Sequence, residues 1–208
     1  MINQIISKLQ IRLKTDLPGK IAHDLMSSPG RLVREKIKPI NPRISAVLIL
    51  LFPKENLIKV PLILRPQYDG VHSGQIAFPG GRREDIDKDV IDTALRETFE
   101  EIGVLIPRSQ VIGELSQLYI PPSNSLVTPV VAYSKNSLEY EIDTTEVDKV
   151  FDVPLHNFKR PENRKMVPLN VRGFKFIAPS FQVSGQTVWG ATAMMISELI
   201  MILNDFHD

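Results

Sequence analysis

The sequence predicts a mixed α/β domain in which helices cover both sides of a mixed β-sheet. Two observations indicate this class: apolar patterns of strand and helix type alternate along the chain, and no repeat, low-complexity segment or long linker divides it. At 208 residues and 23.5 kDa, the chain is long enough for one domain with its own core. We therefore expect a single domain over residues 1–208, with a helical N-terminal extension over about residues 1–40.

Five segments have the apolar spacing or the end signals of helices. The segment that begins near Asp87 is followed by Gly103, which is suited to a C-terminal cap. A turn is expected at Ser28-Pro29-Gly30. The predicted helices cover 2–14, Lys20–Met26, Asp87–Glu101, Glu146–Phe151 and Ala191–Asn204.

The segments between these helices are short, rich in β-branched and apolar residues, and bounded by turn residues, as is typical of strands. Turns are expected at Pro53–Asn56 and near Ser184-Gly185, and residues 66–75 have the composition of a loop. The predicted strands cover Ser45–Phe52, Leu57–Arg65, Ile76–Phe78, Val111–Ile120, Ser125–Tyr133, Val167–Ile177 and Phe181–Trp189.

Charge and composition exclude several classes of function. The 25 basic and 24 acidic residues nearly cancel, so we expect no general attraction to nucleic acid or to an anionic membrane. The absence of cysteine excludes disulfides, thiolate metal sites and cysteine nucleophiles, and it fits a cytoplasmic location. The N-terminus lacks the pattern of a signal peptide, and no apolar stretch reaches the ~18 residues of a membrane span.

Three glutamates on the helix predicted at Asp87–Glu101 carry the chemical interpretation. At about 100° per residue, Glu97, Glu100 and Glu101 share one arc, beside an apolar arc that packs on the sheet. Clustered carboxylates repel one another, and a hard divalent cation relieves that repulsion. We expect Mg²⁺ or Mn²⁺ here, since such ions also bind phosphate oxygens and activate water.

A helix with several glutamates is more often a solvated face, so this alternative needs weighing. Arg96 would in that case pair only with Asp92 or Glu100 along the helix. The combination with a Phe-Pro-Gly-Gly turn upstream and a glycine cap downstream favours a site, because glycine lets backbone approach a metal or a phosphate closely.

This segment resembles the Nudix box, G-x5-E-x7-R-E-U-x-E-E-x-G-U, where U is bulky and apolar. The residues that match its second half are Arg96, Glu97, Glu100, Glu101, Gly103 and Val104. The resemblance implies that Glu97, Glu100 and Glu101 bind the metal, that Glu97 is also a candidate general base, and that Arg96 orients the glutamates. It also implies an α/β/α sandwich around a mixed sheet.

The first half of the box departs from the general pattern. Asp87 stands in place of the first glutamate, Thr98 takes an apolar position, and the spacing from Gly81 to Arg96 is one residue longer. These departures are typical of the branch that resembles coenzyme A pyrophosphatases. Likeness to that branch covers nearly the whole chain.

That branch has a second signature, approximately L-L-T-x-R-[SA]-x3-R-x3-G-x3-F-P-G-G. The matching residues here are Leu62, Arg65, Gly74, Phe78, Pro79, Gly80 and Gly81, and the departures are Pro61, Ile63, Pro66 and Gly70. Gly70 replaces the second arginine, which removes a potential phosphate contact and weakens the assignment to coenzyme A.

Several residues outside the box are candidates for substrate contacts. Arg65 ends a strand beside the diglycine turn, where its guanidinium suits a phosphate, although a surface salt bridge is equally compatible. His72 and Gln75 flank Gly74 in the same loop, and Gly80 and Gly81 form the turn itself. A lone histidine in a loop is more often only exposed, and Arg82 and Arg83 could either attract an anionic substrate or be solvated in a turn. Glu146 is the candidate for the additional carboxylate that many members of the family draw from a later loop; its alternative is a favourable charge at a helix N-terminus. Trp189 is expected to pack in the core.

The resemblance implies hydrolysis of a pyrophosphate linkage in a small nucleotide substrate, foremost coenzyme A or a derivative, to 3′,5′-ADP and 4′-phosphopantetheine. Another nucleoside diphosphate derivative, such as ADP-ribose or a dinucleotide, is the alternative. A non-catalytic nucleotide-binding module is a third, which the three retained glutamates disfavour. No nucleic-acid or membrane partner is expected, and the sequence leaves a homodimer open.

Overall fold

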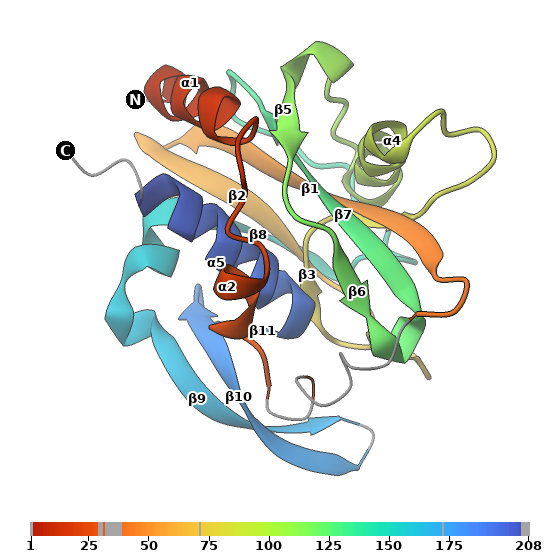
Figure 1. Ribbon diagram of the computed structural model, residues 1–208. Helices are drawn as coiled ribbons and strands as arrows, with labels where there is room; N and C mark the ends of the chain where they lie inside the picture. The colour runs from red at the N-terminus through yellow and green to blue at the C-terminus, as the bar shows by residue number, and fades with distance from the viewer. Residues whose placement is uncertain (1, 29–30, 32–38, 71, 172, 205–208) are drawn as a thin grey trace.

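The computed structural model describes residues 2–28, 31, 39–70, 72–171 and 173–204 (Figure 1). Part of the turn expected at Ser28-Pro29-Gly30 and most of the second half of the N-terminal extension lie outside these residues. Within the described part, no helix is both long and apolar enough to cross a bilayer.

The larger sheet is mixed, as expected for the predicted fold class. Its central order is β3-β2-β1-β7-β5, with β1 and β7 parallel and the other pairs antiparallel. Further strands extend it, since β4 pairs with β1, β6 with β7, and β8 with β2. The bounds are β1 Arg43–Lys54, β2 Leu57–Leu64, β3 Ile76–Ala77, β4 Gly80–Arg82, β5 Val111–Glu114, β6 Leu118–Ile120, β7 Ser125–Tyr133 and β8 Lys149–Pro154.

A second sheet of three antiparallel strands follows near the C-terminus, in the order β11-β10-β9. Figure 1 shows its long β9–β10 hairpin extending away from the larger sheet. The strands are β9 Arg164–Val171, β10 Phe174–Val183 and β11 Gln186–Trp189.

Helices cover both faces of the larger sheet, because successive side chains of β1 point to opposite faces and both sets are apolar. Ala46, Leu48 and Leu50 join a core with Ala94 and Ile102 of α4. The intervening residues of β1 face a second core that contains α5 and part of α1. The helices are α1 Ile2–Arg12, α2 Lys20–Asp24, α4 Val90–Ile102 and α5 Gly190–Asn204, with short 3-10 helices at Arg108–Gln110, Pro121–Ser123, Leu155–Lys159 and Pro161–Asn163.

The helix expected at Glu146–Phe151 is wrong. This segment forms a turn followed by β8, in which Phe151 and Val153 lie opposite Leu62 and Val60 of β2. Pairing with β2 therefore outweighs the local helical pattern.

Three strand predictions also need correction. The strand expected over Val111–Ile120 is divided into β5 and β6, because the backbone N–H of Ser116 donates to Glu198 instead of to a neighbouring strand. Two strands are expected at Val167–Ile177 and Phe181–Trp189, but the structure has three, β9, β10 and β11. A turn at Gly173, with φ of 82°, divides the first expected strand. The turn at Ser184-Gly185 is confirmed between β10 and β11.

A buried polar network attaches the N-terminal segment to the rest of the domain. Glu198 of α5 is fully buried and accepts hydrogen bonds from Gly19 N (3.0 Å), Ser116 Oγ (2.6 Å) and His23 Nε2 (3.0 Å). Burial raises the pKa of the Glu198 carboxyl, but the hydrogen bonds from His23 and Ser116 outweigh it and leave that pKa below its usual value.

Alanine at Ser116 should therefore destabilise the protein by about 1.5–3 kcal/mol, the range for a hydrogen bond to a charged group. Urea unfolding at pH 7 measures the change. Ser137→Ala is the control, because Ser137 is exposed and its replacement should stay within about 0.5 kcal/mol of wild type. Equal stability of the two variants would show that Glu198 does not depend on this hydroxyl.

Candidate active site

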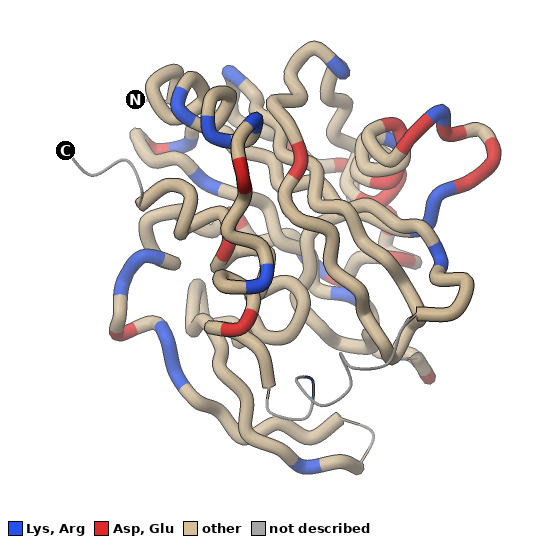
Figure 2. Tube along the Cα trace, in the orientation of Figure 1, with Lys and Arg blue, Asp and Glu red and all other residues tan. Residues whose placement is uncertain are grey.

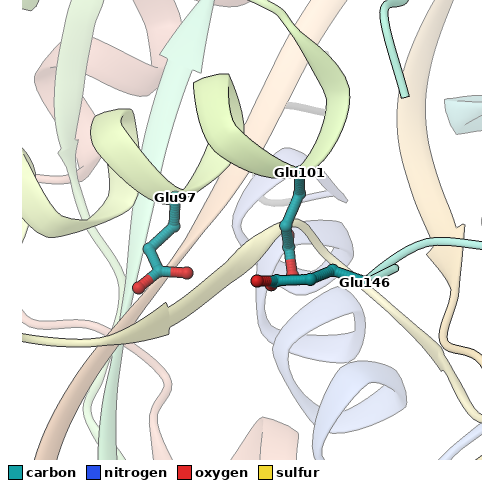
Figure 3. Close-up of side chains that lie close together, drawn as sticks. All are labelled: Glu97, Glu101 and Glu146. Carbon is teal, nitrogen blue, oxygen red and sulfur yellow. The ribbon is translucent and has the colours of Figure 1, made fainter. Parts of the chain in front are cut away.

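Three carboxylates converge beside the larger sheet (Figure 3). Glu97 and Glu101 come from α4, and Glu146 comes from the turn before β8. One oxygen of each lies within 4.8 Å of the others. Residues far apart in the sequence thus form one acidic cluster, and a single helix face carries Glu97 and Glu101.

The ends of α4 fix which way its glutamates point. Asp89 caps the N-terminus, where its side chain accepts from the N–H groups of Ile91 and Asp92, both at 3.0 Å. Gly103 ends the helix in the left-handed conformation, as the sequence predicts. The helix starts at Val90 rather than at Asp87, because Asp89 is the capping residue and the carboxylate of Asp87 is held by another side chain.

The side chain that holds Asp87 is Arg96. Its guanidinium donates two hydrogen bonds of 2.9 Å to Asp87, and it also lies 3.0 Å from Glu97 and 2.7 Å from Glu100. The hydrogen bonds from Arg96 are the first cause that lowers the pKa of Asp87, to about 2. The aspartate at the first box position thus anchors the arginine that contacts Glu97.

Glu101 is the most enclosed member of the cluster, with 1% of its surface exposed. It accepts from the N–H of Gly80 at 2.8 Å and from Arg65 Nη2 at 3.2 Å. Burial raises the pKa of Glu101 to about 8, and the nearby Glu97 and Glu146 add to this increase. Burial also raises the pKa of Glu97. The protein therefore holds negative charge here at a cost, as expected of a cation site.

Gly80 and Gly81, which the sequence predicts in a turn, lie in β4 and provide the space that these carboxylates occupy. A Cβ on Gly81 would lie 2.3 Å from an Oε atom of Glu97. A Cβ on Gly80 would lie 2.3 Å from the carbonyl oxygen of Ala46, and Gly80 has φ of 147°. Gly81 faces α4, and its neighbours along β4 face the opposite side of the sheet.

On that opposite side lies a cleft of about 1180 Å³. One face of the sheet forms the floor of this cleft. Every second residue at the start of β1 (Arg43, Ser45 and Val47) points into it, and Ser45 lies opposite Arg82 of β4. The same face continues over β7 and β6. Other walls come from the loop with His72 and from β10, β11 and α5, whose lining residues include Phe174, Phe176, Ile177, Trp189 and Met195. The three glutamates do not line it; the cleft reaches them at Arg65, Gly80 and Gly81.

Not every predicted residue enters the cluster. Glu100 is half exposed, and its carboxylate is held by Arg96, so its role as a ligand stays a prediction. His72 and Gln75 hydrogen-bond to each other at 3.3 Å at the cleft, where burial lowers the pKa of His72. Arg65 contacts Glu101 rather than a surface partner.

Two interpretations outside the box also change. Glu146 does not begin a helix, so the favourable helix charge assigned to it is wrong, and it lies instead in the cluster. Trp189 is half-buried at the cleft wall, where its ring meets Phe176 edge-on with centroids 5.9 Å apart, rather than in the core. No local pattern places Glu146, because its position depends on the pairing of β8 with β2 and on the hydrogen bond from the N–H of Asp143 to the carbonyl of Glu101 in α4.

The cluster suits a hard divalent cation on chemical grounds. Its donors are carboxylate oxygens, which Mg²⁺ prefers, and Glu101 is already oriented by two donors outside the cluster. Figure 2 shows acidic positions gathered along α4 and the loop before it.

A helix of oriented carboxylates beside the two glycines of β4 and a nucleotide-sized cleft defines the class as a hydrolase of phosphate compounds. Residues 42–169 match the family model of the NUDIX domain. The human protein named mitochondrial coenzyme A diphosphatase NUDT8 is 33% identical over 180 residues, which cover 84% of this chain and 74% of the human one. The Nudix hydrolase NudL of Photorhabdus laumondii is 34% identical, with 76% and 84% covered. A MutT/nudix family protein from Enterococcus faecalis shares the fold, with a TM-score of 0.56 at 15% identity, over 88% of this chain and 72% of that one.

The chain therefore belongs to the Nudix family. It is a pyrophosphohydrolase on the mixed α/β fold of that family, in the branch with NUDT8 and NudL.

Proposed function

We propose that this pyrophosphohydrolase cleaves the diphosphate of coenzyme A or of one of its derivatives, to 3′,5′-ADP and 4′-phosphopantetheine. The observation that carries the proposal is the cleft, which runs from Arg65, Gly80 and Gly81 at the cluster to an apolar wall on β10 and α5. Coenzyme A has a charged nucleotide half, which suits the end of the cleft at the cluster, and a long, weakly polar pantetheine arm, which suits the apolar wall. The name of the human relative agrees with this substrate class.

Glu97, Glu101 and Glu146 would hold the divalent cation, with Glu100 as a further ligand after it leaves Arg96. When bound, Mg²⁺ or Mn²⁺ would neutralise charge on diphosphate oxygens and lower the pKa of a water. Glu97 is the proposed general base, because burial raises its pKa and prepares it to accept a proton at a carboxylate oxygen.

The remaining residues position these groups. Arg96 holds Glu97, and Arg65 holds Glu101 beside the N–H of Gly80. Gly81 leaves the space for the Glu97 carboxylate. His72 and Gln75 stand at the cleft wall, where they can donate to phosphate oxygens or to a bound water.

The test is direct. Purified protein is incubated with coenzyme A and Mg²⁺ or Mn²⁺, and the products are resolved by chromatography. Formation of 3′,5′-ADP and 4′-phosphopantetheine supports the proposal. Intact coenzyme A beside consumed ADP-ribose or dinucleotide would move the substrate to another nucleoside diphosphate derivative. The cytoplasmic location stays a prediction, since the human relative is named as mitochondrial.

We also predict which carboxylate completes the cation site. Glu146→Gln should weaken Mn²⁺ binding by about 10–100-fold, because its oxygen lies in the cluster. Glu100→Gln should weaken binding less, because the Glu100 carboxylate contacts Arg96. Calorimetric titration of both variants with Mn²⁺ measures the order, and a larger loss in Glu100→Gln would reverse it.

A further inference from the structure

The charge of the cleft exceeds what the scissile diphosphate requires. Its lining residues, all within the described part of the chain, include cationic side chains and no aspartate or glutamate. This contrasts with a net charge of only +1 for the whole protein. The cationic lining residues are Arg31, Arg43, Arg65, Arg82 and Lys175.

These cations differ in what they already bind. Arg65 is held by Glu101 and by the carbonyl of Gly80, and Arg31 donates to the carbonyl of Tyr119. Arg43 and Arg82 make no ion pair with any residue that the structure describes, and the guanidinium of neither has a side-chain hydrogen bond there. The backbone of Arg82 is engaged separately, since it pairs with Ser45 of β1 and its carbonyl accepts from Arg96.

Strand register brings the two arginines to neighbouring positions on one face of the sheet. Arg82 of β4 lies opposite Ser45 of β1, and Arg43 is two residues before Ser45, so it points to the same face. Diagonal neighbours of this kind have Cα atoms roughly 7–8 Å apart. Ser125 of β7 lies beside Arg43 on the same face. Two like charges thus stand together in a cleft, flanked by two hydroxyl groups.

The pair is adjacent to the reaction site and distinct from it. Along β4, Gly80 and Arg82 face the cleft, and Gly81 between them faces Glu97. A diphosphate held at the cluster near Gly80 leaves Arg82 one strand repeat further along the floor, at about 6–7 Å. That separation suits a second phosphate on the same nucleotide.

We propose that Arg43 and Arg82, with Ser45 and Ser125, bind a phosphomonoester on the ribose of the nucleoside half, a group that takes no part in the cleavage. This inference rests on the proposed diphosphate substrate, and it adds the feature by which the enzyme selects among nucleoside diphosphate derivatives. Two guanidinium groups suit the dianion because each offers a planar pair of donors.

The kinetic test compares coenzyme A with 3′-dephospho-coenzyme A, which differ only in this phosphomonoester. Wild type should have a kcat/KM at least about tenfold higher for coenzyme A. Arg43→Gln and Arg82→Gln should each lower kcat/KM for coenzyme A by about tenfold and change the value for the dephospho form less than about twofold. Arg160→Gln is the control, since it removes the same exposed charge outside the cleft. Equal losses on both substrates, or no loss on either, overturns the proposal.

A binding measurement separates this inference from the choice of substrate. Adenosine 3′,5′-bisphosphate and 5′-AMP are titrated into wild type and into the Arg43→Gln/Arg82→Gln double variant. The bisphosphate should bind at least about tenfold more tightly to wild type, and the double variant should lose that preference. This result would stand even if coenzyme A itself were not cleaved. Equal affinities of the two nucleotides for wild type contradict the subsite.

Discussion

Glutamine in place of Glu101 is expected to reduce turnover by about 10²–10³-fold, with the protein still folded. The substitution removes the charge of the most buried member of the acidic cluster and keeps its size. The hydrogen bond from the N–H of Gly80 can persist on the amide oxygen, whereas Arg65, which donates to the other carboxylate oxygen, then faces the amide nitrogen. The loss should therefore fall on cation binding and on the chemical step rather than on the fold.

The same variant should be more stable than wild type in alkaline, metal-free solution. Burial raises the pKa of Glu101 from 4.5 to about 8 in the folded protein. A carboxyl with a raised folded-state pKa destabilises the fold progressively as pH increases from its unfolded pKa through its folded pKa. A tenfold change in the acid dissociation constant corresponds to about 1.4 kcal/mol, so the cost above pH 8 is on the order of a few kcal/mol.

Thermal unfolding in EDTA at pH 5 and pH 9 measures this change. The stability of Glu101→Gln relative to wild type should increase between the two pH values, and Glu162→Gln, at an exposed position on the 3-10 helix Pro161–Asn163, should follow wild type. Added Mn²⁺ should stabilise wild type far more than the variant. A variant that loses stability relative to wild type as the pH rises would contradict the assigned cost of the charge.

The sequence predicts the parts of the site that lie close together in the chain. Glu97 and Glu101 are one helical turn apart, so spacing alone places them on one face of α4. Gly103 ends that helix as predicted, and Arg96 contacts Glu97 as the resemblance implies. Local spacing is sufficient here because the helix carries these groups on its own backbone.

The parts that depend on tertiary pairing are not predictable in the same way. The segment that begins at Glu146 has a helical pattern, which predicts a helix, but its second part pairs with the edge of β2 and forms β8. This pairing acts together with backbone hydrogen bonds from Glu141 and Asp143 to the last residues of α4, and the two contacts bring Glu146 to the cluster. The cationic floor of the cleft has the same origin, since Arg43 and Arg82 become neighbours only when β4 pairs with β1.

Gly81→Ala is expected to lower kcat by about 10²-fold with little loss of stability. The new Cβ would lie 2.3 Å from one Oε atom of Glu97 and 2.5 Å from its Cδ, so the carboxylate must rotate away from the cluster. A displacement of about 1 Å in a catalytic group is sufficient for a loss of this size. The atoms that must move belong to a flexible side chain, so the backbone of β4 can stay in place.

Gly80→Ala provides the contrast, because its Cβ would meet the carbonyl oxygen of Ala46 at 2.3 Å and Gly80 has φ of 147°. That variant should lose stability as well as activity. A double-mutant cycle then tests the mechanism for Gly81: in a Glu97→Gln background, Gly81→Ala should cost little further activity, because both changes act through one carboxylate. Fully additive losses in kcat would mean that Gly81 acts on the reaction by a route other than Glu97.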